Sequence, residues 1–143
     1  MNKQAVACDN TSVGVIARDY QDKILLVVSK RYPYGWAPPS GHCDGHSYGT
    51  AAFREFEGET GLIIIGAPRP VTLFKSRKYF KCWRGGEYHD WQIFEVNWKG
   101  ELELSQDETK DACWFTVEEI CELANSGLLE PVWCEFFKEL KII

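Results

Sequence analysis

Blocks of apolar and polar positions along the chain predict strands in its first two thirds and helices at its end. Two apolar runs, residues 12–20 and 23–30, are joined by the polar segment DYQD and predict a β-hairpin. A second hairpin is predicted from residues 78–83 and 88–96, which flank the turn RGGE. Residues 62–74 are also rich in β-forming side chains, although Gly66 and two prolines interrupt them.

Three helices are predicted, one in the middle of the chain and two at its end. Residues 50–60 follow a helical pattern, and Gly61 is placed to end that helix. Thr116 with Glu119 forms a capping-box pattern that begins the second helix, and Pro131 suits the first turn of the third. The order of elements favours an α/β (α+β) sandwich with mixed strands around one acidic helix, rather than a regular βαβ repeat.

Length and charge limit the classes of function. A chain of 143 residues suits one compact domain spanning residues 1–143. The formal net charge of −5 argues against broad nucleic-acid binding, which needs a basic face. It does not exclude a small anionic substrate, because a bound divalent cation inverts the local field.

The cysteines do not predict a zinc site. None of the six lies in a C-x-x-C pair, and no local cluster of Cys and His is present. Scattered thiols of this kind are typical of buried side chains in the reducing cytoplasm. The first ten residues contain no apolar stretch long enough for a signal peptide, and no segment has transmembrane length.

The segment GHCDGHSYGTAAFREFEGETGL combines a small-residue loop with a helix that carries several glutamates. Glu55 and Glu59 are four residues apart and therefore share a helix face, where their charges repel. A hard cation such as Mg²⁺ would offset that repulsion, and Gly41 and Gly45 would let the backbone approach it closely. From the helix alone, a solvated acidic face is the alternative interpretation.

The whole segment resembles the signature of the Nudix hydrolase family. That signature is Gly, five free positions, Glu, seven free positions, and then Arg-Glu-apolar-any-Glu-Glu-any-Gly-apolar. The stretch REFEGETGL matches its second half in register, and APPSGHCDG is similar to the loop that opens it. The resemblance covers most of the chain and implies a Nudix-like α/β/α sandwich, with the box helix on one face of a mixed sheet and the C-terminal helices beyond. It also implies a Mg²⁺- or Mn²⁺-dependent pyrophosphohydrolase.

Two positions depart from the signature. The loop is one residue short, so the first family Glu falls at His46 or Ser47, depending on the end from which it is counted. Asp44 is our candidate for the missing partner of Arg54. Gly58 replaces the first Glu of the Glu-Glu pair, which indicates either close packing of another backbone or loss of a carboxylate that the site no longer needs.

The resemblance assigns roles to the positions that match. It implies that Glu55 and Glu59 bind the metal, together with the backbone carbonyl of Ser40 or Gly41. It implies that Arg54 holds the loop against the helix. A later loop often adds a carboxylate in this family, and here residues 107–111 offer three.

Among these three carboxylates, Asp107, Glu108 and Asp111, we favour Glu108 as ligand or base. The alternative is an ordinary polar surface loop.

Substrate contacts are less determined by the sequence. Lys75 and Arg77 alternate along a predicted strand and could project together towards phosphates, but ordinary surface decoration is the favoured interpretation for most basic residues of this stretch. Trp36 and Trp91 are candidates for stacking on a base, with core packing as the alternative.

Two functions remain at this stage. The first is Mg²⁺-dependent hydrolysis of a nucleoside diphosphate linked to another moiety, preferably a (deoxy)nucleoside triphosphate because the chain is short. The second is a Nudix-fold nucleotide-binding or regulatory module with weak or no catalysis, which Gly58 and the missing loop Glu favour. In both cases we expect a small-molecule nucleotide as partner, no nucleic acid, no membrane and a cytoplasmic location, and a homodimer is left open.

Overall fold

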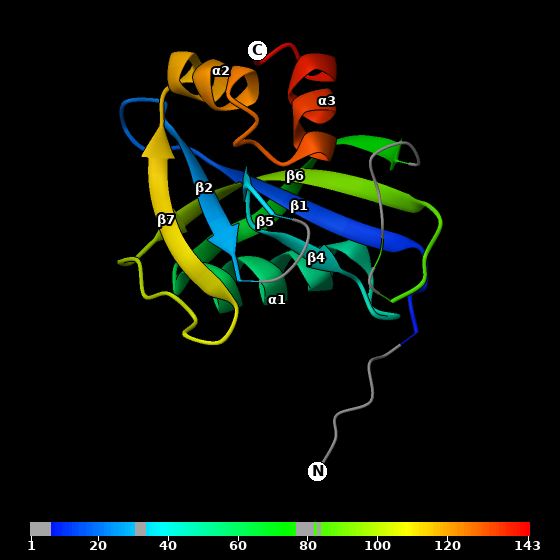
Figure 1. The fold of residues 1–143 in the computed structure, drawn as a ribbon. Helices are drawn as coiled ribbons and strands as arrows, with labels where there is room; N and C mark the ends of the chain where they lie inside the picture. Colours follow the sequence, from blue (N-terminus) through cyan, green and yellow to red (C-terminus); the bar gives the residue numbers. More distant parts are fainter. Residues whose placement is uncertain (1–6, 31–33, 77–81, 83) are drawn as a thin grey trace.

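The chain folds into two β-sheets and three helices in the computed structural model, which describes residues 7–30, 34–76, 82 and 84–143 (Figure 1). The elements follow in the order β1 (Thr11–Ala17), β2 (Ile24–Ser29), β3 (Trp36–Ala37), β4 (Ser40–His42), α1 (Tyr48–Thr60), β5 (Ile63–Ser76), β6 (His89–Lys99), β7 (Thr109–Phe115), α2 (Val117–Asn125) and α3 (Pro131–Glu139). None of the helices in the described part of the chain has both the length and the apolar character needed to cross a membrane.

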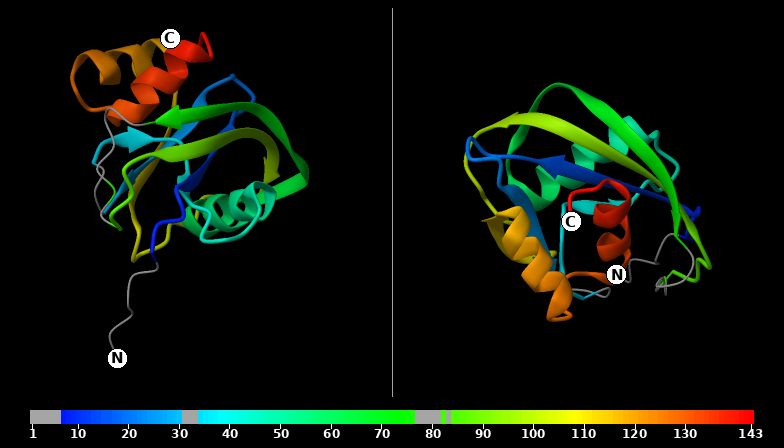
Figure 2. Two further views of the ribbon diagram at one scale, coloured as in Figure 1. Left: turned by 90° about the vertical axis from the view of Figure 1, so that its right-hand side faces the viewer. Right: turned by 90° about the horizontal axis from the view of Figure 1, so that it is seen from above.

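The larger sheet is mixed, as predicted. Its strands lie in the order β4-β1-β6-β5, with β1 parallel to β6 and the other two pairs antiparallel. The smaller sheet has the order β3-β2-β7 and is antiparallel throughout. The two sheets lie between α1 on one side and α2 with α3 on the other, so the predicted α/β/α sandwich is confirmed (Figures 1 and 2).

The first predicted hairpin is wrong. The turn forms, because the Asp19 N–H donates to the Lys23 carbonyl and Arg18 bridges Ile24. Beyond that bridge β1 and β2 separate into different sheets. Both strands are buried along most of their length, and their pairing with β6 and β7 decides the topology.

The predicted pairing of residues 78–83 with 88–96 stays a prediction. Strand β6 instead pairs with β5, from Ile63–Lys99 to Ser76–His89, and the register shifts between Ile65 and Arg69 and between Pro70 and Thr72, where the glycine and prolines lie. The predicted strand 78–83 lies outside the described residues except for Cys82, which is not in a strand. The connection between the two strands therefore passes through Cys82 and residues 84–88.

Two core clusters hold the layers together. Ala51, Ala52 and Phe56 of α1 pack on one face of the large sheet, against side chains such as Val15 and Val96. Trp133 and Phe137 of α3 and Ile120 of α2 pack in the second cluster, on the other side. The apolar face of each helix thus fixes its position, which agrees with the amphipathic patterns in the sequence.

Both ends of α1 are capped. The Ser47 hydroxyl accepts the Thr50 N–H at the start, and Gly61 at φ +74° ends the helix by donating its N–H to the Glu57 carbonyl. The predicted end at Gly61 is confirmed, and the helix begins two residues before the predicted Thr50. A side chain at position 61 would also meet the Glu103 backbone at 2.7 Å, so glycine is required there.

The carboxyl group of Glu130, at the N-terminus of α3, is expected to make stability depend on pH. The residue is 8% exposed, and burial raises the pKa of its carboxyl to about 8. The folded state therefore binds a proton that the unfolded state releases near pH 4.5, so stability decreases as the pH rises from about 4.5 to about 8.

We expect Glu130→Gln to be more stable than the wild type by about 2–4 kcal/mol at pH 8 and about equally stable at pH 4, because each pKa unit corresponds to about 1.4 kcal/mol. Urea unfolding at both pH values measures this difference. Glu135→Gln, on the exposed face of the same helix, is the matched control, and its difference in stability from the wild type should be the same at both pH values. An equal effect of Glu130→Gln at both pH values would contradict the prediction.

Candidate functional site

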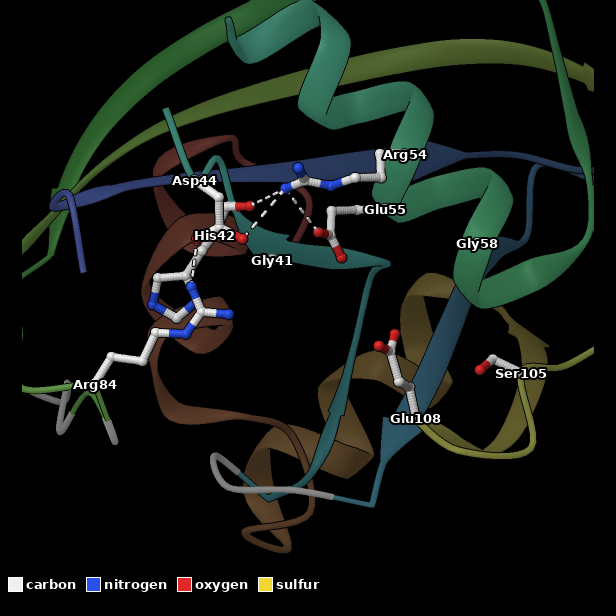
Figure 3. Close-up of a pocket in the computed structure, with 9 residues that line it drawn as sticks. All are labelled: Gly41, His42, Asp44, Arg54, Glu55, Gly58, Arg84, Ser105 and Glu108. Atoms are coloured by element: carbon white, nitrogen blue, oxygen red, sulfur yellow. Dashed lines mark hydrogen bonds and ion pairs between the residues drawn. The ribbon is translucent and has the colours of Figure 1, made fainter. Parts of the chain in front are cut away.

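A polar cleft of about 530 Å³ opens beside the box helix (Figure 3). It is bounded by α1, the β4–α1 loop, the loop before β6 and the loop before β7. Most of its lining is charged or polar. The lining residues are Gly41, His42, Asp44, Arg54, Glu55, Gly58, Arg84, Ser105 and Glu108. Three of the four residues predicted to be catalytic are in this set.

Arg54 joins the helix to the loop. Its guanidinium Nη2 donates to the His42 carbonyl at 2.6 Å, and it lies 3.3 Å from Glu55 Oε1 and 3.7 Å from Asp44 Oδ2. Asp44 also forms an ion pair with Arg84, so its carboxylate lies between two guanidinium groups. The predicted pairing of Asp44 with Arg54 is confirmed.

Neither residue at the position of the missing family Glu replaces it. Ser47 caps α1, and the His46 backbone N–H donates to the Cys43 carbonyl while the residue is exposed. Because the loop is one residue shorter than the signature, the carboxylate that reaches Arg54 comes from Asp44, earlier in the loop.

Glu55 lies at the centre of the cleft. The pKa of its carboxyl is raised to about 7. Burial is the main cause, the charge of Arg54 opposes it, and the charge of Glu108 adds to it. A Cβ at Gly41 would overlap this carboxyl group, so only glycine lets strand β4 approach so closely. The backbone of β4 at Gly41 and the carboxylate of Glu55 in α1 therefore lie against each other at the cleft.

Glu59 lies one helical turn after Glu55 and is not in the lining of the cleft. Its Oε2 accepts the N–H of Ser40 at 3.2 Å. Burial raises the pKa of its carboxyl well above the usual range, and the neighbouring charges of Glu55 and Glu108 act in the same direction. Two desolvated carboxyl groups, with the exposed carboxylate of Glu108 nearby, form a set of oxygen donors that suits a hard divalent cation such as Mg²⁺ or Mn²⁺.

Glu108 is the carboxylate of the later loop that lines the cleft, and it points toward Glu55 in Figure 3. Its backbone carbonyl accepts the N–H of Lys30, which ties the loop to the end of β2. Asp107 and Asp111 are not among the lining residues. The preference for Glu108 among the three thus agrees with the placement of the loop.

Gly58 lies at the rim of the cleft with open space beside it. A Cβ built at this position has nothing within 4 Å, and the residue is exposed. Close packing of another backbone is therefore not the reason for this glycine. The third carboxylate of the signature is absent although the fold has room for it.

The two candidate tryptophans are outside the lining of the cleft. Trp91 is 4% exposed and packs edge-on against Trp133 and Phe136, so core packing is the correct alternative and no base can stack on it. Trp36 is half-buried against Phe115. Neither tryptophan is in the lining of the cleft.

Of the two basic candidates, only Lys75 belongs to the described part of the chain. Its ammonium group is 3.5 Å from Asp90 Oδ1 and 5.1 Å from the centre of the Tyr88 ring, outside the lining of the cleft, which supports surface decoration. Arg77 lies outside the described residues. Besides Arg54, the cleft is lined by Arg84, a basic residue that follows these two candidates in the chain and that no local sequence signal distinguishes.

We expect Gly41→Ala to lower the affinity for Mg²⁺ by about tenfold, the lower end of the range for residues that orient metal ligands. The added methyl group would displace the Glu55 carboxylate, which is the flexible end of a side chain, so the free energy of unfolding should change little. Calorimetric titration with Mg²⁺ and urea unfolding measure the two quantities. Gly49→Ala, whose Cβ meets open space, is the matched control; unchanged affinity in Gly41→Ala would contradict the assigned contact.

Comparison with known proteins shows the family to which the chain belongs. The NUDIX domain family matches residues 9–132. The fold is similar to a MutT protein from Methanosarcina mazei Go1 (TM-score 0.75, 18% identity, 96% of each chain covered). It is also similar to a MutT NUDIX hydrolase from Burkholderia pseudomallei (TM-score 0.64, 21% identity, 76% of this chain and 84% of that one).

A third solved structure, an Ap4A hydrolase from C. elegans, aligns with a TM-score of 0.55 and 21% identity over 90% of this chain and 98% of that one. No curated protein sequence matches the chain significantly. The family match spans most of the chain and includes the loop, the box helix and the late carboxylate loop. The chain therefore belongs to the Nudix hydrolase family of pyrophosphohydrolases.

Proposed function

We propose that the protein is a Mg²⁺- or Mn²⁺-dependent hydrolase of a nucleoside diphosphate linked to another moiety, with (deoxy)nucleoside triphosphates as the preferred class. One observation carries the proposal: the carboxyl groups of Glu55 and Glu108 line one cleft beside the Arg54-anchored loop, and Glu59 lies near enough to both for their charges to raise the pKa of its carboxyl. When bound there, the cation would neutralise phosphate charge and lower the pKa of its bound water.

In this proposal each residue of the cleft has a separate task. Glu55, Glu59 and the backbone carbonyl of Gly41 hold the cation. Arg54 positions the loop through its bond to the His42 carbonyl. Glu108 accepts the proton of the attacking water as the new P–O bond forms and the anhydride P–O bond breaks, which releases the second phosphate-bearing product.

Arg84 adds a positive charge on the opposite wall. Its guanidinium lines the cleft while it is ion-paired to Asp44. We infer that it contacts phosphate oxygens of the substrate, the task that sequence analysis gave to Lys75 and Arg77. Free cysteine thiols in the described residues fit a reducing cytoplasmic setting.

Solved structures of similar fold point to the same class of substrate. One is an Ap4A hydrolase and another a UDP-X diphosphatase, and the names of both proteins refer to a nucleoside with linked phosphates. Within this class, the preference for a triphosphate is tested by the panel of substrates described below.

The second candidate is a nucleotide-binding module on the same fold with little or no hydrolysis. Gly58 favours it, because the third carboxylate of the signature is missing at a place where the fold would accommodate one. The loop also lacks the family Glu, and Asp44 takes over its contact with Arg54.

The deciding experiment incubates the purified protein with nucleoside triphosphates, dinucleotides and nucleotide sugars in Mg²⁺ or Mn²⁺, and measures released phosphate and pyrophosphate. Turnover that needs the cation and is lost in Glu55→Gln would support the hydrolase. Nucleotide binding without turnover, detected by calorimetry, would support the binding module. A melting temperature unaffected by either cation, with and without nucleotide, would contradict the metal site itself.

A further inference from the structure

Four metal-ligating side chains from distant parts of the chain meet beside the cleft. They are Cys8 before β1, His42 at the end of β4, Cys82 in the β5–β6 connection and His89 at the start of β6. One ligand atom from each lies within 4.8 Å of the other three. The expectation of no zinc site rested on spacing along the chain, whereas the fold gathers Cys and His residues that have no such spacing.

The distances suit one tetrahedral ion. Cys8 Sγ lies 3.0 Å from His89 Nε2, and Cys82 Sγ lies 3.3 Å from His42 Nε2. Ligands around a tetrahedral Zn²⁺, with Zn–S about 2.3 Å and Zn–N about 2.0 Å, are separated from one another by about 3.3–3.8 Å. The four ligand atoms lie within 4.8 Å of one another, so small movements of these side chains would give that arrangement.

The surroundings orient the ligands. The Ser12 hydroxyl, which is buried, hydrogen-bonds Nδ1 of His89, and Nε2 of the same ring faces Cys8. With a metal on Nε2, Nδ1 would carry the proton and donate it to Ser12, the kind of contact that fixes the ring of a metal-binding histidine. Gly86 also leaves room for the group, because a Cβ there would lie 2.6 Å from Cys8 Sγ and 3.3 Å from His89 Nε2.

The donor set selects the ion. Two thiolates and two imidazoles form a closed set of sulfur and nitrogen ligands, typical of structural zinc sites and unsuited to Mg²⁺, which prefers oxygen. We propose that Cys8, His42, Cys82 and His89 bind one Zn²⁺ ion in a structural site, distinct from the carboxylate site of the cleft.

Such an ion would fasten two walls of the cleft together. His42 follows Gly41, and its carbonyl accepts the Arg54 hydrogen bond. Arg84 lies two residues after Cys82 and pairs with Asp44 of the same loop. Zinc would therefore join the N-terminal segment, the β4–α1 loop and the β5–β6 connection, and hold Arg84 at the cleft.

Metal analysis of the full chain tests the site. The protein is produced with zinc in the medium, purified under reducing conditions with excess Mg²⁺, dialysed against a weak chelator and analysed by mass spectrometry. We expect about one zinc per chain in the wild type and loss of most of it in Cys82→Ser. Cys113→Ser, which removes an exposed thiol elsewhere, is the matched control and should retain the zinc.

Cobalt gives a second readout that needs no variant. Co²⁺ added to the zinc-depleted wild type should produce the visible bands of tetrahedral cobalt and a thiolate-to-cobalt charge-transfer band, and Zn²⁺ should remove both. Wild-type protein without zinc and without these bands would overturn the proposal, as would equal zinc content in Cys82→Ser. A Cys8–Cys82 disulfide that persists under reducing conditions would also overturn it.

The zinc proposal is separable from the proposed hydrolysis. Glu55→Gln should keep the zinc while losing turnover, because its carboxylate is not among the four ligands. Zinc content with no turnover in the wild type would contradict only the hydrolase. Turnover without zinc would contradict only the structural site.

Discussion

Replacing Glu59 by Gln is expected to lower kcat for the preferred substrate by about 10²–10³-fold, the range found when one electrostatic group at a reacting centre is removed. Gln keeps the shape of the side chain and can still accept the Ser40 N–H through its amide oxygen. What it removes is the negative charge that, in the proposed function, binds the cation. Steady-state kinetics at saturating Mg²⁺ measure the loss.

The stability of the same variant should change in the opposite direction. Burial and the nearby charge of Glu55 raise the pKa of the Glu59 carboxyl, so its charged form is unfavourable in the metal-free protein. A neutral Gln relieves that cost, and we expect the metal-free variant to be more stable than the wild type by about 1–3 kcal/mol at pH 8. The rise in melting temperature on adding Mg²⁺ should disappear.

Glu57→Gln is the matched control. Glu57 belongs to the same helix, but its carboxylate accepts the N–H of Ile64 in β5, whereas that of Glu59 accepts the N–H of Ser40 beside Gly41. Its replacement should leave kcat within about twofold, as expected of a substitution away from the reacting groups. A Glu59→Gln enzyme with wild-type kcat would show that this carboxylate is not a metal ligand.

The sequence predicted the parts of this fold that local interactions decide. The ends of α1 and α2 follow from Gly61 and from the Thr116 capping box, and the pairing of Arg54 with Asp44 follows from their proximity in the chain. The contacts that define these features join residues a few positions apart or within one loop and helix. A pattern read along the chain therefore contains them.

The parts that were not predicted depend on distant residues. Strands β1 and β2 separate because β6 and β7 pair with them, and nothing in the turn DYQD indicates this. Trp91 is an apolar side chain that suits a pocket or a core equally well until its neighbours are known. The Cys and His cluster requires three segments to be brought together, so its spacing along the chain carries no metal signature.

Gly58 is a different case, because two explanations of this glycine were open from the sequence and the geometry removes one. The open space beside this residue excludes close packing. What remains is a missing carboxylate on the helix turn that carries Glu55 and Glu59. Restoring a carboxylate at position 58 therefore tests whether the cleft needs it for metal binding and hydrolysis.

Gly58→Glu is expected to increase Mg²⁺ affinity and kcat/KM by about 10–100-fold, because it adds an oxygen ligand at the rim of the cleft without a steric conflict. Replacing a helical glycine should also stabilise the helix by about 0.5–1 kcal/mol, although repulsion from Glu55 offsets a few tenths of that in the absence of metal. Calorimetric Mg²⁺ titration and steady-state kinetics measure the two gains.

Gly58→Ala separates the two contributions. It should give the gain in stability, measured by urea unfolding, with no gain in metal affinity or turnover, because it restores the helix former without the carboxylate. If Gly58→Glu behaves like Gly58→Ala, the prediction is contradicted and Glu55, Glu59 and Glu108 already form a complete site. If the wild type binds nucleotide without turnover and Gly58→Glu hydrolyses it, then loss of this one carboxylate is what separates a binding module from an enzyme on this fold.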